Sequence, residues 1–129
     1  MAHHEALTSP AAAPPIGPYS HAVRCGDLLF VSGQLPADPA TGALVEGGAG
    51  AQAARVLENL RVLLESLDSG LPHVLKTTVF LTDMDDFAEV NEVYARYFSQ
   101  APPARSCVAV AALPKGARVE MDCIAALGE

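Results

Sequence analysis

The apolar positions between residues 53 and 67 place the strongest constraint on the fold. Seven apolar side chains recur there at the three- and four-residue spacing of one helical face: Ala53, Val56, Leu57, Leu60, Leu63, Leu64 and Leu67. Polar residues take the other face, and Gly70 follows as a natural helix stop. A helix with one apolar stripe must bury it, so we expect this helix to pack against a β-sheet.

Two strands are predicted before this helix. The stretches 20–25 and 28–32 are separated by a Gly-Asp pair, which predicts a tight hairpin. Residues 28–31 are apolar without alternation, a pattern typical of a central strand that is covered on both faces. Gly33 follows directly, and a glycine there would let the backbone approach another group closely.

Two other segments favour little regular structure. Residues 1–15 end in Ala-Ala-Ala-Pro-Pro and predict an extended, partly mobile lead-in. Residues 36–50 contain an Asp-Pro pair and several glycines, which favour a flexible loop without a helix or strand. With 129 residues, the chain is long enough for one core and too short for two, so we assign residues 1–129 to a single domain.

A strand and a second helix follow the first helix. Residues 76–81 are rich in β-branched and apolar side chains, which predicts the strand. The second helix should begin near Asp85 and Asp86, with an aspartate cap that Glu89, three residues after Asp86, reinforces. Asn91 lies on the apolar face of that helix, where an amide needs a hydrogen bond. It could tie down a neighbouring loop or help to line a cleft beside Phe87.

Residues 103–113 predict a strand of small apolar side chains that carries an arginine and a cysteine near its start. Because strand side chains alternate in direction, Arg105 and Cys107 should point to the same face. A guanidinium on an apolar strand needs an anion, since an unpaired charge at low dielectric is costly. Two kinds of anion are available: a carboxylate of the protein, such as Glu120 or Asp122, or the carboxylate of a ligand.

A last strand is expected around Val-Glu-Met at 119–121, after a Pro-Lys-Gly turn. The predicted order is therefore strand, strand, helix, strand, helix, strand, strand. Two helices on one face of a mixed sheet would form a two-layer α+β sandwich.

Composition narrows the range of partners. The formal net charge is −7 and the eight basic residues are scattered, which argues against a nucleic-acid partner. The sequence has neither an apolar run of about 18 residues nor a signal-peptide pattern, so we expect a cytoplasmic protein with no membrane partner. Three unevenly spaced cysteines predict free thiols and no metal site. Half of the residues are hydrophobic, which suggests that partner subunits cover some apolar surface.

Five blocks of the sequence resemble the Rid family of reactive intermediate deaminases, also called YjgF. They are Ile-Gly-Pro-Tyr at 16–19, Val-Ser-Gly-Gln-Leu-Pro at 31–36, Lys-Thr-Thr-Val-Phe at 76–80, Asp-Phe-Ala-Glu-Val-Asn at 86–91, and Pro-Ala-Arg-Ser at 103–106 followed by Val-Glu-Met at 119–121. The resemblance covers nearly the whole chain. It implies a chorismate-mutase-like fold and a homotrimer with ligand clefts between subunits.

The resemblance also implies an activity: hydrolysis of 2-iminopropanoate, 2-iminobutanoate and their enamine tautomers to 2-keto acids and ammonia, without a cofactor or metal. Arg105 would grip the substrate carboxylate with its planar fork of donors, and Glu120 would position and activate the attacking water. Cys107 could also be a nucleophile, but an activated thiolate usually has a base beside it and no motif provides one. Cys107 would more plausibly pack against the ligand or contact the water. The remaining cleft residues would be Tyr19, Ser32, Gly33, Phe87 and Asn91.

Other functions compete with imine hydrolysis. A non-catalytic trimer that binds small carboxylates, or acts as a chaperone, would use the same clefts. A ribonuclease or translation inhibitor, an activity associated with some relatives, is disfavoured by the acidic charge and by the lack of a paired histidine site. Chorismate mutase is suggested by fold likeness alone, and its dianionic substrate needs several cations where this sequence offers one convincing arginine.

Overall fold

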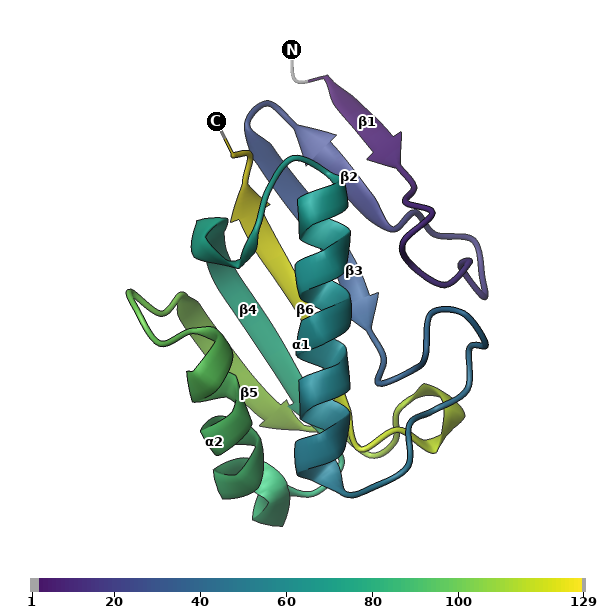
Figure 1. Cartoon of the computed structure of the whole chain (residues 1–129), viewed down its shortest axis with the longest axis vertical. Helices are drawn as coiled ribbons and strands as arrows, with labels where there is room; N and C mark the ends of the chain where they lie inside the picture. Colours follow the sequence, from purple (N-terminus) through teal and green to yellow (C-terminus); the bar gives the residue numbers. More distant parts are fainter. Residues whose placement is uncertain (1–2, 129) are drawn as a thin grey trace.

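The computed structural model describes residues 3–128, which form six strands and two α-helices (Figure 1). In chain order the elements are β1 (His4–Leu7), β2 (Ala22–Cys25), β3 (Leu28–Gln34), α1 (Ala49–Ser66), β4 (Val74–Leu81), α2 (Phe87–Tyr97), β5 (Ala104–Ala109) and β6 (Val119–Ala126). The predicted order of strands and helices is confirmed, and β1 is an additional strand within the lead-in. Short 3-10 turns at Leu71–His73, Met84–Asp86 and Pro114–Gly116 connect the later elements.

The six strands form one mixed sheet in the order β1-β2-β3-β6-β4-β5. β4 and β5 are parallel, and the other neighbouring strands are antiparallel. Parallel neighbours need a long crossover connection, which α2 supplies between β4 and β5. Both helices lie on one face of the sheet (Figure 1), which confirms the predicted two-layer α+β sandwich.

The apolar stripe of α1 lies at the centre of the core. Leu57, Leu60 and Leu64 are completely buried in one cluster with the helix-facing side chains of the sheet. α1 begins at Ala49, inside the segment 36–50 that the sequence predicts to be a loop, because Ala49 is itself completely buried in this core. No helix among residues 3–128 is both long enough and apolar enough to cross a membrane.

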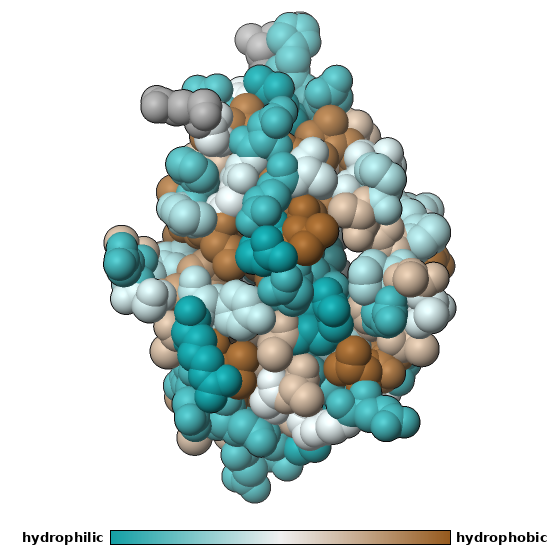
Figure 2. Space-filling model, in the orientation of Figure 1, coloured by the Kyte–Doolittle hydropathy of each residue, from teal (hydrophilic) through white to brown (hydrophobic). Residues whose placement is uncertain are grey.

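Only one face of the sheet is covered by helices. Leu29 and Val31 of β3 are buried beneath them, whereas Phe30 points the other way and is 44% exposed. The prediction that residues 28–31 are covered on both faces is therefore wrong for the single chain. We call the helix-free side, which carries Phe30 and Val108, the open face. Figure 2 shows the opposite, helix-bearing side, where hydrophilic side chains follow α1.

Carboxylates at the start of α2 bind partners other than those the capping pattern predicts. Asp86 accepts two hydrogen bonds from the Arg118 guanidinium, at 2.8 and 2.9 Å, and Glu89 accepts one from the backbone N–H of Gly50 at 3.0 Å. The predicted capping pair of Asp86 and Glu89 is therefore wrong, and Asp83 caps the preceding 3-10 turn instead. A carboxylate gains more from a charged donor such as the Arg118 guanidinium than from a neutral N–H, which explains why Asp86 binds Arg118.

β5 is shorter than the strand predicted over residues 103–113. It ends at Ala109 because its partner β4 ends at Leu81. The carbonyl of Leu81 accepts the last hydrogen bond from the N–H of Val110, at 2.7 Å. Beyond that point the chain has no neighbouring strand to continue the ladder, and it turns towards β6.

In the part that the structure describes, the lead-in is extended at its start, as predicted, and then turns at residues 9–12. β1 pairs antiparallel with β2, which places a strand at one edge of the sheet. The buried His21 ring fixes the segment that follows: its Nδ1 accepts from the N–H of Ser9 at 2.9 Å, and its Nε2 donates to the carbonyl of Ala13 at 2.8 Å. His21 is thus a satisfied structural histidine.

Candidate functional site

The candidate site residues of β5 and β6 lie on opposite faces of the sheet. Arg105 of β5 pairs with the buried Thr77 of β4, and Cys107 follows two residues later on the same, helix-covered side. The predicted shared face of Arg105 and Cys107 is therefore confirmed. Glu120 of β6 pairs with Phe80 of β4 and faces the open side, away from both.

Three side chains from one face of α2 surround the Arg105 guanidinium. Its Nη1 donates to Oδ1 of Asn91 at 2.6 Å, and its Cζ lies 4.9 Å from the centre of the Tyr94 ring and 5.6 Å from that of Phe87. Spacings of four and three residues put these side chains on one face of the helix. We call Phe87, Asn91 and Tyr94 the arginine cradle. Of the two alternatives for Asn91, the structure favours the one that places it beside Phe87. Its side-chain amide accepts a hydrogen bond from Arg105 and does not tie down a loop.

Arg105 forms no salt bridge with a carboxylate in the part of the chain that the structure describes. Its side chain is exposed, and Glu120 and Asp122 lie on the other face of the sheet. The alternative in which either carboxylate pairs with Arg105 is therefore wrong within one chain. A guanidinium carries five N–H donors, so the cradle leaves several of them available for an external anion.

Cys107 is partly buried beside Arg105. Burial raises the pKa of its thiol, and the nearby Arg105 charge offsets this only in part. A thiol with a raised pKa is a poor nucleophile at neutral pH, which favours a packing role over covalent catalysis. No group of three or more His, Cys, Asp or Glu side chains within residues 3–128 is placed to hold a metal ion.

Glu120 and Gly33 are in direct contact on the open side. β3 is irregular between Val31 and Gln34 where it pairs with β6, and Gly33 lies in this bulge. A Cβ atom at Gly33 would lie 2.1 Å from Oε2 of Glu120 and 2.9 Å from its Cδ. The close approach predicted at Gly33 is therefore real, and the group that needs the space is the Glu120 carboxylate.

The Glu120 carboxyl holds its proton more tightly than an ordinary glutamate. Burial is the main cause of its raised pKa, and the negative charge of Asp122, two residues along the same face of β6, adds to the effect. A carboxyl with a raised pKa is better suited than an ordinary glutamate to take a proton from water and to return it.

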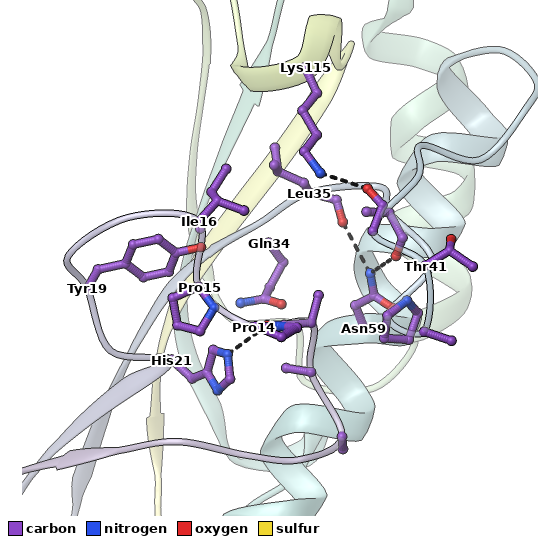
Figure 3. Close-up of a pocket in the computed structure, with 18 residues that line it drawn as sticks. Pro14, Pro15, Ile16, Tyr19, His21, Gln34, Leu35, Thr41, Asn59 and Lys115 are labelled. Carbon is purple, nitrogen blue, oxygen red and sulfur yellow. Dashed lines mark hydrogen bonds between the residues drawn. The ribbon is translucent and has the colours of Figure 1, made fainter.

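Ser32 and Tyr19 lie near Gly33, where β3 meets the lead-in. The Ser32 hydroxyl donates to the carbonyl of Ser20 at 2.6 Å, so it fixes the backbone that leads to Tyr19. Tyr19 is 46% exposed, and its ring extends along the wall of a pocket that it shares with Gly33 (Figure 3).

This pocket has a volume of about 390 Å³, within the range of small-molecule sites. Mostly apolar residues of the lead-in and of the loop before α1 line this pocket, and Asn59 of α1 lines it too (Figure 3). Asn59 also braces the loop, because its side-chain amide donates to the carbonyls of Leu35 and Ala37. Lys115 links the loop to the segment before β6 by donating to the carbonyl of Gly42 at 2.7 Å.

Residues 10–127 match the family described as Endoribonuclease L-PSP. The mouse 2-iminobutanoate/2-iminopropanoate deaminase is 47% identical over an alignment that covers 88% of this chain and 84% of the mouse protein. The chain belongs to the Rid family. Protein DfrA of Myxococcus xanthus is 53% identical to this Rid protein over 94% of each chain. RidA from the Antarctic bacterium Psychrobacter sp. PAMC 21119 has a TM-score of 0.91 at 42% identity, covering 95% of this chain and 99% of that one.

Two residues of this Rid protein belong to the site although the sequence pattern gave neither a chemical role. The Tyr94 hydroxyl and Oγ1 of Thr77 are 2.7 Å apart in a buried hydrogen bond, directly beneath Arg105. The available signal was the placement of Phe87, Asn91 and Tyr94 on one helical face. An aromatic residue on an apolar stripe is normally part of the core, so the cation above its ring was not foreseeable.

Proposed function

We propose that this chain hydrolyses small 2-imino acids, 2-iminopropanoate and 2-iminobutanoate among them, to 2-keto acids and ammonia. The observation that carries the proposal is the exposed Arg105 guanidinium, oriented by the arginine cradle and without a carboxylate partner among residues 3–128. Its planar fork can accept a carboxylate through two parallel hydrogen bonds. Membership of the Rid family, and the name of the mouse relative, support this reaction class.

Glu120 supplies the proton transfers in this proposal. Its carboxylate takes a proton from a water molecule whose oxygen attacks C2 of the protonated imine, which gives a neutral carbinolamine. The carboxyl then returns that proton to the nitrogen, the C–N bond breaks, and the C2–O bond becomes the carbonyl of the keto acid. The hydroxyl proton leaves with ammonia as ammonium. The raised pKa of Glu120 supports both transfers.

We further propose that a second copy of the chain completes the site. Arg105 and Glu120 face opposite sides of one sheet, and a substrate of three or four carbons cannot reach both within a single chain. The open face also exposes the apolar side chains of Phe30 and Val108, which a neighbouring copy would cover. A homotrimer, as the Rid resemblance implies, would bring Arg105 of one copy to Glu120 of the next.

A coupled assay tests the activity. A threonine dehydratase generates the imine while semicarbazide competes for it, and keto acid formation is followed with and without the protein. We expect the wild type to accelerate keto acid formation, and Arg105→Ala to lower kcat/KM by about 10²-fold, because the substrate carboxylate loses its charged partner. Arg96→Ala is a matched control, since Arg96 is exposed on α2 and forms its ion pair with Glu92 of the same helix.

The outcomes separate the alternatives. Full turnover by Arg105→Ala would contradict the carboxylate role of Arg105. If the wild type binds 2-keto acids but does not accelerate imine hydrolysis, the protein is a carboxylate-binding or chaperone-like member of its family.

Mixing two inactive variants tests the shared site. Arg105→Ala and Glu120→Ala proteins are unfolded and refolded together, so that mixed assemblies form. If each site combines Arg105 of one copy with Glu120 of another, some mixed sites regain both residues and activity returns. Equal inactivity of mixed and separate proteins, with mixed assemblies shown by mass spectrometry, would overturn the proposal.

A further inference from the structure

Tyr94 of α2 reaches Thr77 of β4 with its hydroxyl, and its ring is nearer to the Arg105 guanidinium than the Phe87 ring is. The side chain is 6% exposed, and Thr77, which shares its hydroxyl hydrogen bond, is completely buried. Burial raises the pKa of the Tyr94 hydroxyl, so the ring remains neutral. The Arg105 guanidinium thus lies over the Tyr94 ring, and the hydrogen bond to Thr77 fixes the orientation of that ring.

Thr77 connects this ring to the strand that carries the arginine. It is the residue paired with Arg105 between β4 and β5, so the position of its backbone sets that of Arg105. Its side chain meanwhile holds the Tyr94 hydroxyl. Thr77 therefore contacts Arg105 and Tyr94 in two ways. Its backbone positions the backbone of Arg105, and its side chain positions the ring that lies against the Arg105 guanidinium.

We propose that Tyr94 and Thr77 are positioning residues for carboxylate binding by Arg105. The Tyr94 ring supports the guanidinium from the helix side, Thr77 sets the tilt of that ring, and Asn91 engages one donor. The remaining N–H donors are then available to the carboxylate of a 2-oxo or 2-imino acid. This role of Tyr94 rests on the proposed function of Arg105.

The physical gain is preorganisation. A free arginine side chain has many rotamers, and their loss on binding weakens affinity. A cation above an aromatic ring is held by the quadrupole of the ring, and an aliphatic side chain of similar size lacks this attraction. The cradle therefore removes much of the ordering cost before the ligand arrives.

Direct binding of 2-oxobutanoate, measured by calorimetry, tests the proposal without requiring turnover. Tyr94→Leu should raise Kd by roughly 3- to 30-fold, the loss expected for a partly desolvated cation–π contact. Tyr94→Phe keeps the ring but loses the hydrogen bond to Thr77, so its Kd should rise by less than that of Tyr94→Leu. Tyr97→Leu is the matched control, because Tyr97 lies one turn further on α2, where its hydroxyl contacts Ala54 at 3.4 Å and Arg105 is not its neighbour.

A spectroscopic measurement distinguishes positioning from a general loss of structure. In the wild type, slow rotation of the Arg105 guanidinium should give separate Nη signals in ¹⁵N-labelled protein. Tyr94→Leu should average them, and Tyr97→Leu should not. If Tyr94→Leu does not fold, Thr77→Val preserves the shape of the side chain while removing the hydroxyl that fixes the ring. It should raise Kd and broaden the same signals.

The results separate this inference from the proposed function. Binding of 2-oxobutanoate that depends on Tyr94, without imine turnover, would support the positioning role and refute the deaminase. Turnover with an unchanged Kd and KM in Tyr94→Leu would overturn the positioning role alone. Unchanged Kd and Nη signals in Thr77→Val would overturn the part assigned to Thr77, and failure of the wild type to bind 2-oxobutanoate would overturn the whole inference.

Discussion

Replacing Gly33 by alanine should displace Glu120 while leaving Arg105 untouched. The added Cβ would lie 2.1 Å from Oε2 of Glu120, where an ordinary contact is 3.4 Å or more. The carboxylate must therefore retreat by about 1.3 Å. Its distal atoms are the flexible end of a side chain, so this movement should cost the fold little, about 1 kcal/mol or less.

The effect on catalysis should be larger than the effect on stability. A misplacement of about 1 Å of a group that positions the reacting water can cost about 10²-fold in kcat, equivalent to about 2.7 kcal/mol. KM should remain within about 3-fold of the wild type, because Arg105 still binds the substrate carboxylate. Gly33→Ala should thus be a kcat variant with nearly normal thermal stability.

Steady-state kinetics in the coupled imine assay and thermal unfolding by circular dichroism provide the measurement. Gly70→Ala is the control, because the nearest atom to its added Cβ is Cδ of Pro72 at an ordinary 3.5 Å, and it should behave as the wild type. Glu120→Gln combined with Gly33→Ala should lose no more activity than Glu120→Gln alone. A kcat for Gly33→Ala within about 3-fold of the wild type would refute the assigned role of Glu120.

Other changes probe the electrostatics and the core. Asp122→Asn removes a charge that helps to raise the Glu120 pKa, so the acidic limb of the pH–rate profile should move to lower pH; an unmoved limb would exclude Glu120 as the titrating group. The folded state holds the Glu120 proton more tightly than the unfolded chain does. Ionisation of Glu120 therefore destabilises the folded state as the pH rises from the pKa of the unfolded chain through the pKa of the folded state. Glu120→Gln should therefore raise the melting temperature at neutral pH and have little effect in acid; the opposite pattern would contradict the raised pKa. Asp86→Ala deletes both hydrogen bonds to Arg118 and should lower the free energy of unfolding in urea by about 1–2 kcal/mol. Leu57→Ala should cost about 2–5 kcal/mol by the same measurement, because a completely buried position cannot refill its cavity.

Local patterns carried most of the secondary structure. The apolar stripe of α1 and the Gly-Asp hairpin between β2 and β3 were readable because their signals lie within a few neighbouring residues. The shared face of Arg105 and Cys107 was equally local, since it follows from alternation along one strand. Hydrogen-bond partners could not be predicted from neighbouring residues. The sequence pattern predicted that Asp86 and Glu89 form a helix cap, whereas in the structure they accept hydrogen bonds from Arg118 and Gly50.

The sequence by itself determined the α+β architecture and most of the candidate side chains, because hydrophobic periodicity dictates which surfaces must be buried. Only the tertiary structure decided how those side chains are grouped. Strand register places Arg105 beneath α2 and Glu120 on the open face, and register depends on hydrogen bonds between strands that are distant in the sequence. Tyr94 likewise became part of the site only when α2 packed against the sheet, because a ring supports a cation only where the fold brings the two together.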